Sequence, residues 1–264
     1  MANKYIYILR GVILAVKGLC LGAGGVKGFI HLGVLQYLQE IGVKFDMVSG
    51  CSVGSIVGGL YALGFSPRDM VKELIKIGLD DPKKLLYFRF SDKSISGILN
   101  KITTGAKFNQ TDIPLGIVAV DMYSGKEKVF SQGNIADAMT ASSAIPPYLR
   151  PYKIKDITYV DGAFLNSVPA DIVKDMGAEK ILSVNLSYGR PFNYGNKTNL
   201  DKFYPKNQVP IAEITEQCYK YSTVIIEPDL REYKAFSFTN FDTLFDIGYN
   251  SAQAISEKLK VFQD

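Results

Sequence analysis

One serine in this chain stands in a frame that could make it a nucleophile. Ser52 lies at the centre of Gly50-Cys51-Ser52-Val53-Gly54, a G-x-S-x-G pattern between an apolar segment and a run of small residues. Glycines two positions before and after the serine keep side chains out of a sharp strand-to-helix turn and expose the hydroxyl. The frame predicts a nucleophile elbow for acyl transfer, with Cys51 turned towards the core. A serine that only caps a helix is the alternative.

The hydroxyl of a nucleophilic serine needs a base to take its proton, and that base is usually histidine. The chain has a single histidine, His31, which lies upstream of the elbow in a different predicted element. No residue near His31 in the sequence indicates a carboxylate that would orient it towards Ser52. We therefore expect a structural role for His31, hydrogen-bonded near the start of a helix.

An aspartate offers another base. Asp161 follows an apolar run at its carboxyl end, and Gly162 after it permits a tight departure of the chain. Catalytic groups in open parallel sheets gather outside the carboxyl ends of the strands, which would place Asp161 on the edge where Ser52 stands. An aspartate that only forms a turn is the alternative.

A glycine-rich turn precedes both residues and spans Gly22-Ala23-Gly24-Gly25-Val26-Lys27-Gly28. Such a loop can hold a dinucleotide pyrophosphate, or it can offer bare backbone N–H groups to a developing oxyanion. The dinucleotide fingerprint fits poorly, because Lys27 takes the place of its last glycine. The P-loop pattern fails because Ser or Thr does not follow Lys27. A tight turn without a ligand stays open beside the oxyanion interpretation.

Short apolar runs alternate with helical patterns along the chain, as a parallel sheet requires. The expected strands are 18–21, 45–48, 115–120, 157–160, 181–185 and 223–226, with a lead-in strand at 11–15 and a hairpin turn at 123–126. The expected helices are 26–41, 55–63, one starting at Ser66-Pro67 and a long one at 241–262. We predict an α/β fold, a three-layer sandwich with a mostly parallel central sheet and helices on both faces. One domain would span 1–264, with its motifs in about 18–170.

Two segments lack this regularity. Residues 81–110 mix aromatics, lysines and glycines without a steady period, so we expect a cap or insertion of about 80–110 over the site. Its apolar part, 85–102, contributes to such a cap or belongs to the plain core. Residues 188–208 contain Pro, Gly and Asn throughout and are typical of a surface loop.

Composition narrows the function classes. The three cysteines are widely spaced and mostly in apolar runs, which favours a reducing compartment over a disulfide framework or a zinc site. Residues 5–21 are apolar but contain Arg10 and Lys17, so they predict neither a membrane helix nor a secretory signal. The net charge of +4 is compatible with an anionic membrane surface without establishing one. We expect a cytoplasmic protein, peripheral to membranes when acting, with no metal, cofactor or nucleic-acid partner.

Four blocks of the sequence together resemble the patatin-like phospholipases. They are the glycine loop with His31-Leu32-Gly33-Val34-Leu35 after it, the elbow, the A-S-x-A-x-P segment from Ala141 to Pro146, and Asp161-Gly162-Ala163 with Asn166 and Pro169. The blocks occur in the family's order and cover about 21–169. The family's usual glycine at position 23 is Ala23 here.

The resemblance implies a Ser–Asp dyad in place of a triad. Ser52 would be the nucleophile and Asp161 the base, and the backbone N–H groups of Gly24, Gly25 and Val26 would hold the oxyanion. The motif glycines Gly22, Gly28, Gly50, Gly54 and Gly162 would support the site. Lys27 would bind a lipid phosphate or pack, solvated, beside the loop.

The function that these residues favour is hydrolysis of acyl ester bonds in phospholipids or related lipids, of the phospholipase A or lysophospholipase type, through an acyl-serine intermediate. Two alternatives remain: a catalytically weak lipid-binding or effector protein on the same fold, and a nucleotide-binding protein that uses the glycine loop. The sequence does not indicate the head group, the acyl position or the oligomeric state.

Overall fold

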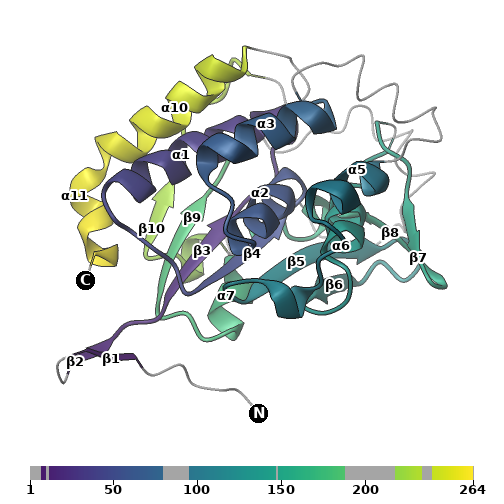
Figure 1. Cartoon of the computed structure of the whole chain (residues 1–264), viewed down its shortest axis with the longest axis horizontal. Helices are drawn as coiled ribbons and strands as arrows, with labels where there is room; N and C mark the ends of the chain where they lie inside the picture. The colour runs from purple at the N-terminus through teal and green to yellow at the C-terminus, as the bar shows by residue number, and fades with distance from the viewer. Residues whose placement is uncertain are drawn as a thin grey trace.

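The protein is built around a mixed β-sheet that separates two layers of helices (Figure 1). The computed structural model describes residues 7–9, 12–79, 95–146, 148–187, 218–233 and 240–263. In these residues eight strands pair in the order β10-β9-β3-β4-β5-β8-β7, and β6 pairs with the other side of β5. The strands are β3 (Lys17–Leu21), β4 (Met47–Cys51), β5 (Leu115–Asp121), β6 (Glu127–Phe130), β7 (Tyr152–Ile154), β8 (Ile157–Asp161), β9 (Lys180–Val184) and β10 (Val224–Ile226).

Side chains alternate between the two faces of the sheet, and each face has its own core. On β3, Leu19 and Leu21 belong to the large core beneath α1 (Gly28–Glu40) and α2 (Val53–Ala62). Cys20 belongs to a smaller core with α7 (Ala170–Asp175) on the opposite face. The predicted three-layer arrangement with helices on both faces is therefore confirmed.

Further helices extend the layer around α1. In Figure 1, α10 (Phe241–Ala254) lies along the side of α1 that faces away from the sheet, with α3 (Pro67–Ile77) beside them. The remaining helical elements are η1 (Gly25–Lys27), α5 (Ile95–Ile102), η2 (Phe108–Gln110), α6 (Ile135–Ser142), η3 (Gly162–Phe164), α11 (Ser256–Leu259) and η4 (Lys260–Phe262).

The sheet is parallel from β10 to β5 and antiparallel beyond it. Strand β8 runs opposite to β4 along the same side of β5, so the carboxyl ends of β4 and β8 meet there. Cys51 pairs with Val118 and Asp161 with Ala119, two consecutive residues of β5. The expectation that Asp161 reaches Ser52 as the end of a parallel strand is therefore wrong. The two residues meet because their strands approach head to head.

Local signals explain most of the element boundaries. The hydroxyl of Ser66 accepts a hydrogen bond from the Asp69 N–H, and Pro67 occupies the first turn of α3, as predicted. Gly78, with a φ of 87°, ends that helix in the left-handed region. The expected hairpin after β5 is also present, with β6 pairing antiparallel to it.

Some expectations need correction, and others fall on residues outside the description. The strand expected at 45–48 is β4, displaced towards the elbow to Met47–Cys51. The helix expected at 241–262 is interrupted at Ile255, between α10 and α11. The lead-in strand is the second arm of a hairpin, β1 (Tyr7–Leu9) with β2 (Val12–Leu14). Of the irregular segment 81–110, the described part from Ile95 contains the helices α5 and η2, whereas 80–94 and the loop at 188–208 lie outside the description.

None of the helices in the described ranges is long and apolar enough to cross a membrane.

Candidate active site

Ser52 occupies a strained turn between β4 and α2. Its φ of 54° and ψ of −125° lie outside the regions that side-chain-bearing residues usually adopt. The flanking glycines permit this turn: a Cβ on Gly50 would lie 2.3 Å from the Gly54 carbonyl oxygen, and one on Gly54 would lie 2.1 Å from that of Leu21. The G-x-S-x-G spacing is therefore required by backbone packing on both sides of the serine.

A second serine fixes the elbow. The Ser142 hydroxyl, at the end of α6, accepts a hydrogen bond from the Ser52 N–H at 2.9 Å. The same hydroxyl donates to the Val118 carbonyl at 2.6 Å. Sequence reasoning placed Ser142 in the A-S-x-A-x-P block but gave it no role. No sequence signal identifies this role, because the contact with Ser52 joins residues 90 positions apart.

Ser52 and Asp161 form a buried hydrogen-bonded pair. The Ser52 hydroxyl donates to Asp161 Oδ2 at 2.7 Å. Asp161 Oδ1 accepts from the Ala163 N–H at 2.9 Å, and the Cys51 thiol lies 3.9 Å from that oxygen. Gly162 is needed beside the pair because a Cβ there would lie 2.3 Å from the Val118 carbonyl oxygen.

Burial raises the pKa of two groups at this site, the Asp161 carboxyl and the Cys51 thiol. Asp161 is 1% exposed, and burial raises its pKa to about 7 although its three hydrogen bonds act in the opposite direction. A carboxylate with a pKa near 7 is a better general base than an ordinary aspartate. Burial, together with the nearby Asp161 charge, also raises the pKa of the Cys51 thiol well above its ordinary value. A thiol in that state is a poor nucleophile, which agrees with the expectation that Cys51 belongs to the core.

The glycine loop turns tightly from β3 into η1. The N–H groups of Gly22 and Ala23 donate to the carbonyls of Val184 and Ser167. Among the described residues, the N–H groups of Gly24, Gly25 and Val26 have no backbone acceptor. Gly25 has a φ of 60° and lines the same pocket as Ser52. Donors without an acceptor beside a nucleophile are the arrangement that an oxyanion requires.

Close packing surrounds this loop. The methyl group of Ala23 is fully buried in a small cluster with Cys51 and Ala163, so the substitution of the usual glycine is accommodated. Glycine occupies the loop positions at which a side chain would have the least room. A Cβ on Gly22 would lie 2.9 Å from the Val184 carbonyl oxygen, and one on Gly28 would lie 2.2 Å from a methyl group of Val53.

Lys27 and His31 support the loop from inside the protein. Lys27 is 5% exposed, and its Nζ donates to the Leu186 carbonyl at 2.6 Å, so a solvated position is wrong. This placement gives no support to a lipid-phosphate contact either. His31 is fully buried, with Nε2 2.8 Å from the Gly22 carbonyl oxygen. Burial lowers its pKa to about 4, so the ring is neutral at physiological pH and Nε2 carries the proton that the carbonyl accepts.

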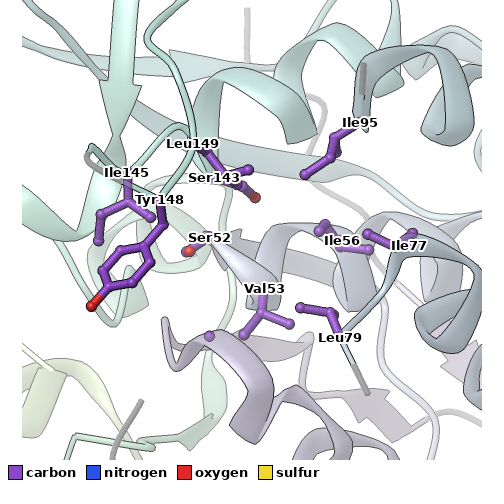
Figure 2. A pocket seen from close by; sticks show the side chains of 11 residues that line it. Ser52, Val53, Ile56, Ile77, Leu79, Ile95, Ser143, Ile145, Tyr148 and Leu149 are labelled. Carbon is purple, nitrogen blue, oxygen red and sulfur yellow. The ribbon is translucent and has the colours of Figure 1, made fainter. Parts of the chain in front are cut away.

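Ser52 opens into an aliphatic pocket (Figure 2). Side chains from α2, the end of α3, the start of α5 and the segment after α6 surround it. The lining residues are Gly25, Ser52, Val53, Ile56, Ile77, Leu79, Ile95, Ser143, Ile145, Tyr148 and Leu149. Ile95 belongs to the region predicted to cap the site. A pocket of this composition suits a hydrocarbon chain.

Known proteins share this sequence pattern. The family model described as patatin-like phospholipase matches residues 19–174. The human patatin-like phospholipase domain-containing protein 6 is 27% identical over 288 residues, covering 94% of this chain and 20% of the relative. An NTE family protein of Mycobacterium tuberculosis is 30% identical over 185 residues, covering 68% of this chain and 51% of the relative. The chain thus spans about a fifth of the length of the human relative.

Solved structures share the fold. VipD from Legionella pneumophila superposes with a TM-score of 0.59 at 15% identity, covering 93% of this chain and 67% of that one. Human GIVD cytosolic phospholipase A2 gives a TM-score of 0.51 at 12% identity, covering 97% and 61%. At these identities the likeness concerns the fold alone.

Proposed function

The chain belongs to the patatin-like phospholipase family, and on that premise we propose that it hydrolyses carboxylic ester bonds of lipids through an acyl intermediate on Ser52. The observation that carries the proposal is the 2.7 Å hydrogen bond from the Ser52 hydroxyl to Asp161 Oδ2, at the wall of an aliphatic pocket. A nucleophile paired with a base and open to an apolar pocket suits an ester of a fatty acid.

In this mechanism Asp161 Oδ2 takes the proton as Ser52 Oγ attacks the ester carbonyl carbon. The developing oxyanion is held by the N–H groups of Gly24, Gly25 and Val26. Collapse of the tetrahedral intermediate expels the alcohol, which receives the proton from Asp161. A water molecule, deprotonated by the same carboxylate, then releases the fatty acid and restores Ser52.

The loop contributes a large part of the rate enhancement in this mechanism. Asp161, with a pKa of about 7, remains far less basic than a serine alkoxide. One well-placed oxyanion donor is worth about 3 kcal/mol in an acyl-transfer enzyme. The Ser142 contacts favour the same chemistry, because they hold the strained backbone of Ser52 in one conformation.

We further propose phospholipids as the substrate class, met at a membrane surface and cleaved as by a phospholipase A or a lysophospholipase. The family and the aliphatic pocket support this finer assignment. Mass spectrometry of the products from vesicles of mixed phospholipid and neutral lipid would identify the bond cleaved. Release of fatty acid from the neutral lipid alone would contradict the phospholipid assignment.

A fluorophosphonate probe tests the nucleophile. We expect labelling of the wild-type protein and of the exposed control Ser131→Ala, with complete loss of labelling in Ser52→Ala. Asp161→Asn should lower turnover by at least about a thousandfold, because the base is removed while its shape is kept. Labelling that survives Ser52→Ala would overturn the proposal. A folded wild-type protein that neither labels nor releases fatty acid would favour the lipid-binding alternative.

A further inference from the structure

The wall of the pocket beside Ser52 includes a second hydroxyl, on Ser143, that no group in the described part of the chain pairs. Ser143 is 6% exposed and lines the pocket. Its Oγ has no hydrogen-bond partner among the described residues. Figure 2 shows this oxygen directed into the space bordered by Ile56 and Ile95.

Other buried hydroxyls close to the site are satisfied by backbone carbonyls. Ser142 donates to the Val118 carbonyl, and Ser55 bonds back to the carbonyl of Ser52. Ser143 follows the last residue of α6 and could have bonded back in the same way, but only its N–H does so, to Met139 and Thr140. Its hydroxyl is thus an exception to the pairing of buried polar groups.

The surroundings define what could pair with this hydroxyl. Seven of the lining residues have aliphatic side chains, among them Ile56, Ile77 and Ile95; the others are Gly25, Ser52, Ser143 and Tyr148. A saturated acyl chain would fill that space and leave the hydroxyl unpaired, which is unfavourable. A chain that carries an oxygen atom at the right depth would satisfy it.

We propose that Ser143 determines acyl specificity by hydrogen bonding an oxygen function, a hydroxyl or a keto group, on the fatty acyl chain of the substrate. The inference rests on the proposed esterase function of Ser52, and it assigns the class of acyl group that this site accepts. Ser143 binds substrate in this scheme and takes no part in proton transfer.

The test compares p-nitrophenyl esters of one saturated fatty acid with those of its monohydroxylated isomers, so that the leaving group stays constant. For wild type we expect kcat/KM for one hydroxyacyl isomer to exceed that for the plain ester by about tenfold, the ratio that one neutral hydrogen bond supplies. Ser143→Ala should remove this preference by lowering the rate on the hydroxyacyl ester. Its rate on the plain ester should rise, because an unpaired hydroxyl no longer faces the hydrocarbon chain, and Ser143→Thr should retain the preference.

A second buried serine serves as a stability control, because its hydroxyl has a partner within the protein. Ser49 is also buried, but its hydroxyl donates to the Pro169 carbonyl at 2.7 Å. Ser49→Ala should lower Tm by roughly 2–4 °C and leave the acyl preference intact. Ser143→Ala should leave Tm unchanged or raise it, because no protein hydrogen bond is lost.

Three outcomes would contradict the inference. The first is an identical ratio of rates in wild type and Ser143→Ala. The second is a Ser143→Ala effect confined to the ratio between monoacyl and diacyl phosphatidylcholine, which would place the oxygen partner on the glycerol. The third is wild type that hydrolyses none of the esters, which would overturn the esterase proposal itself.

Discussion

In the proposed mechanism, the protonation state of the Asp161 carboxyl group decides whether Ser52 can react. Burial raises its pKa to about 7, and the base must be ionised to take the serine proton. We expect kcat/KM to be constant above pH 7 and to fall about tenfold per pH unit below it. A pH–rate profile on a non-ionising ester would measure this decrease in kcat/KM. Full activity down to pH 5 would show that the reactive base is another group.

The same burial makes the ionised carboxylate costly to the fold. The pKa of Asp161 is about 7 in the folded state against an ordinary 3.8, so between these values the folded protein binds more protons than the unfolded chain. The free energy of unfolding therefore decreases as pH rises from about 4 to 7 and then levels off. Asp161→Asn keeps the shape and cannot ionise, so at pH 8 it should be more stable than wild type by up to about 4 kcal/mol.

Denaturant unfolding at pH 4 and pH 8 would measure the difference. The difference in the free energy of unfolding between Asp161→Asn and wild type should decrease towards pH 4, where the native carboxyl is protonated. The control Asp246→Asn changes an exposed aspartate on α10 and should give no comparable gap. An Asp161→Asn protein that is less stable than wild type at pH 8 would contradict the assigned burial cost.

Sequence could predict residues whose motif constrains their own backbone, and Ser52 with its two glycines is the clearest case. The roles of Ser142 and Ser143 could not be predicted. Each depends on contacts that form only when α6 packs beside the elbow, about ninety positions away in the chain. Lys27 was misjudged for a similar reason: its partner, Leu186, lies in a loop 159 positions further on.

At the scale of elements, β8 shows that the hydrophobic pattern of a segment predicts a strand but not its direction in the sheet. The apolar run at 157–160 predicted a strand, and β8 (Ile157–Asp161) is that strand. An apolar run carries no information on strand direction, which follows from the short β7–β8 hairpin and from the free side of β5 beyond the end of β4. Asp161 does lie beside Ser52, as expected, but the premise about the sheet behind that expectation is wrong.

Helix α1 fixes the glycine loop through His31, whose Nε2 lies 2.8 Å from the Gly22 carbonyl oxygen. That carbonyl lies close to the elbow, because a Cβ on Gly54 would be 2.6 Å from it. We expect His31→Leu to lower kcat by about 10- to 100-fold, since the proposed oxyanion donors would shift relative to Ser52. KM should change little, because His31 does not line the pocket.

His31→Gln is the matched variant for this prediction. Its amide nitrogen reaches approximately the position of Nε2 and can donate to the same carbonyl. We expect it to recover most of the kcat lost in His31→Leu, whereas Tm should fall similarly in both. Steady-state kinetics with a soluble ester would separate kcat from KM. Equal loss of kcat in the two variants would assign His31 to packing alone.

At the scale of the whole molecule, the site depends on a helix pair that lies outside it. Helices α1 and α10 cross with backbones almost in contact: a Cβ on Gly248 would lie 2.0 Å from the Ile30 carbonyl oxygen, and one on Gly33 would lie 1.9 Å from that of Phe245. Because both glycines meet backbone atoms, a larger residue must push the helices apart. His31 directly follows Ile30, so that displacement would reach the glycine loop.

Gly248→Ala should therefore lower the free energy of unfolding by about 2–3 kcal/mol, although alanine is the better helix former. Asn250→Ala is the control, because Asn250 lies at an exposed position within the same helix, and it should raise the free energy of unfolding by up to about 0.7 kcal/mol. Denaturant titration of both variants would measure these changes. If Gly248→Ala were as stable as Asn250→Ala, the two helices could move apart without cost, and α10 would not hold α1 in the position that the loop requires.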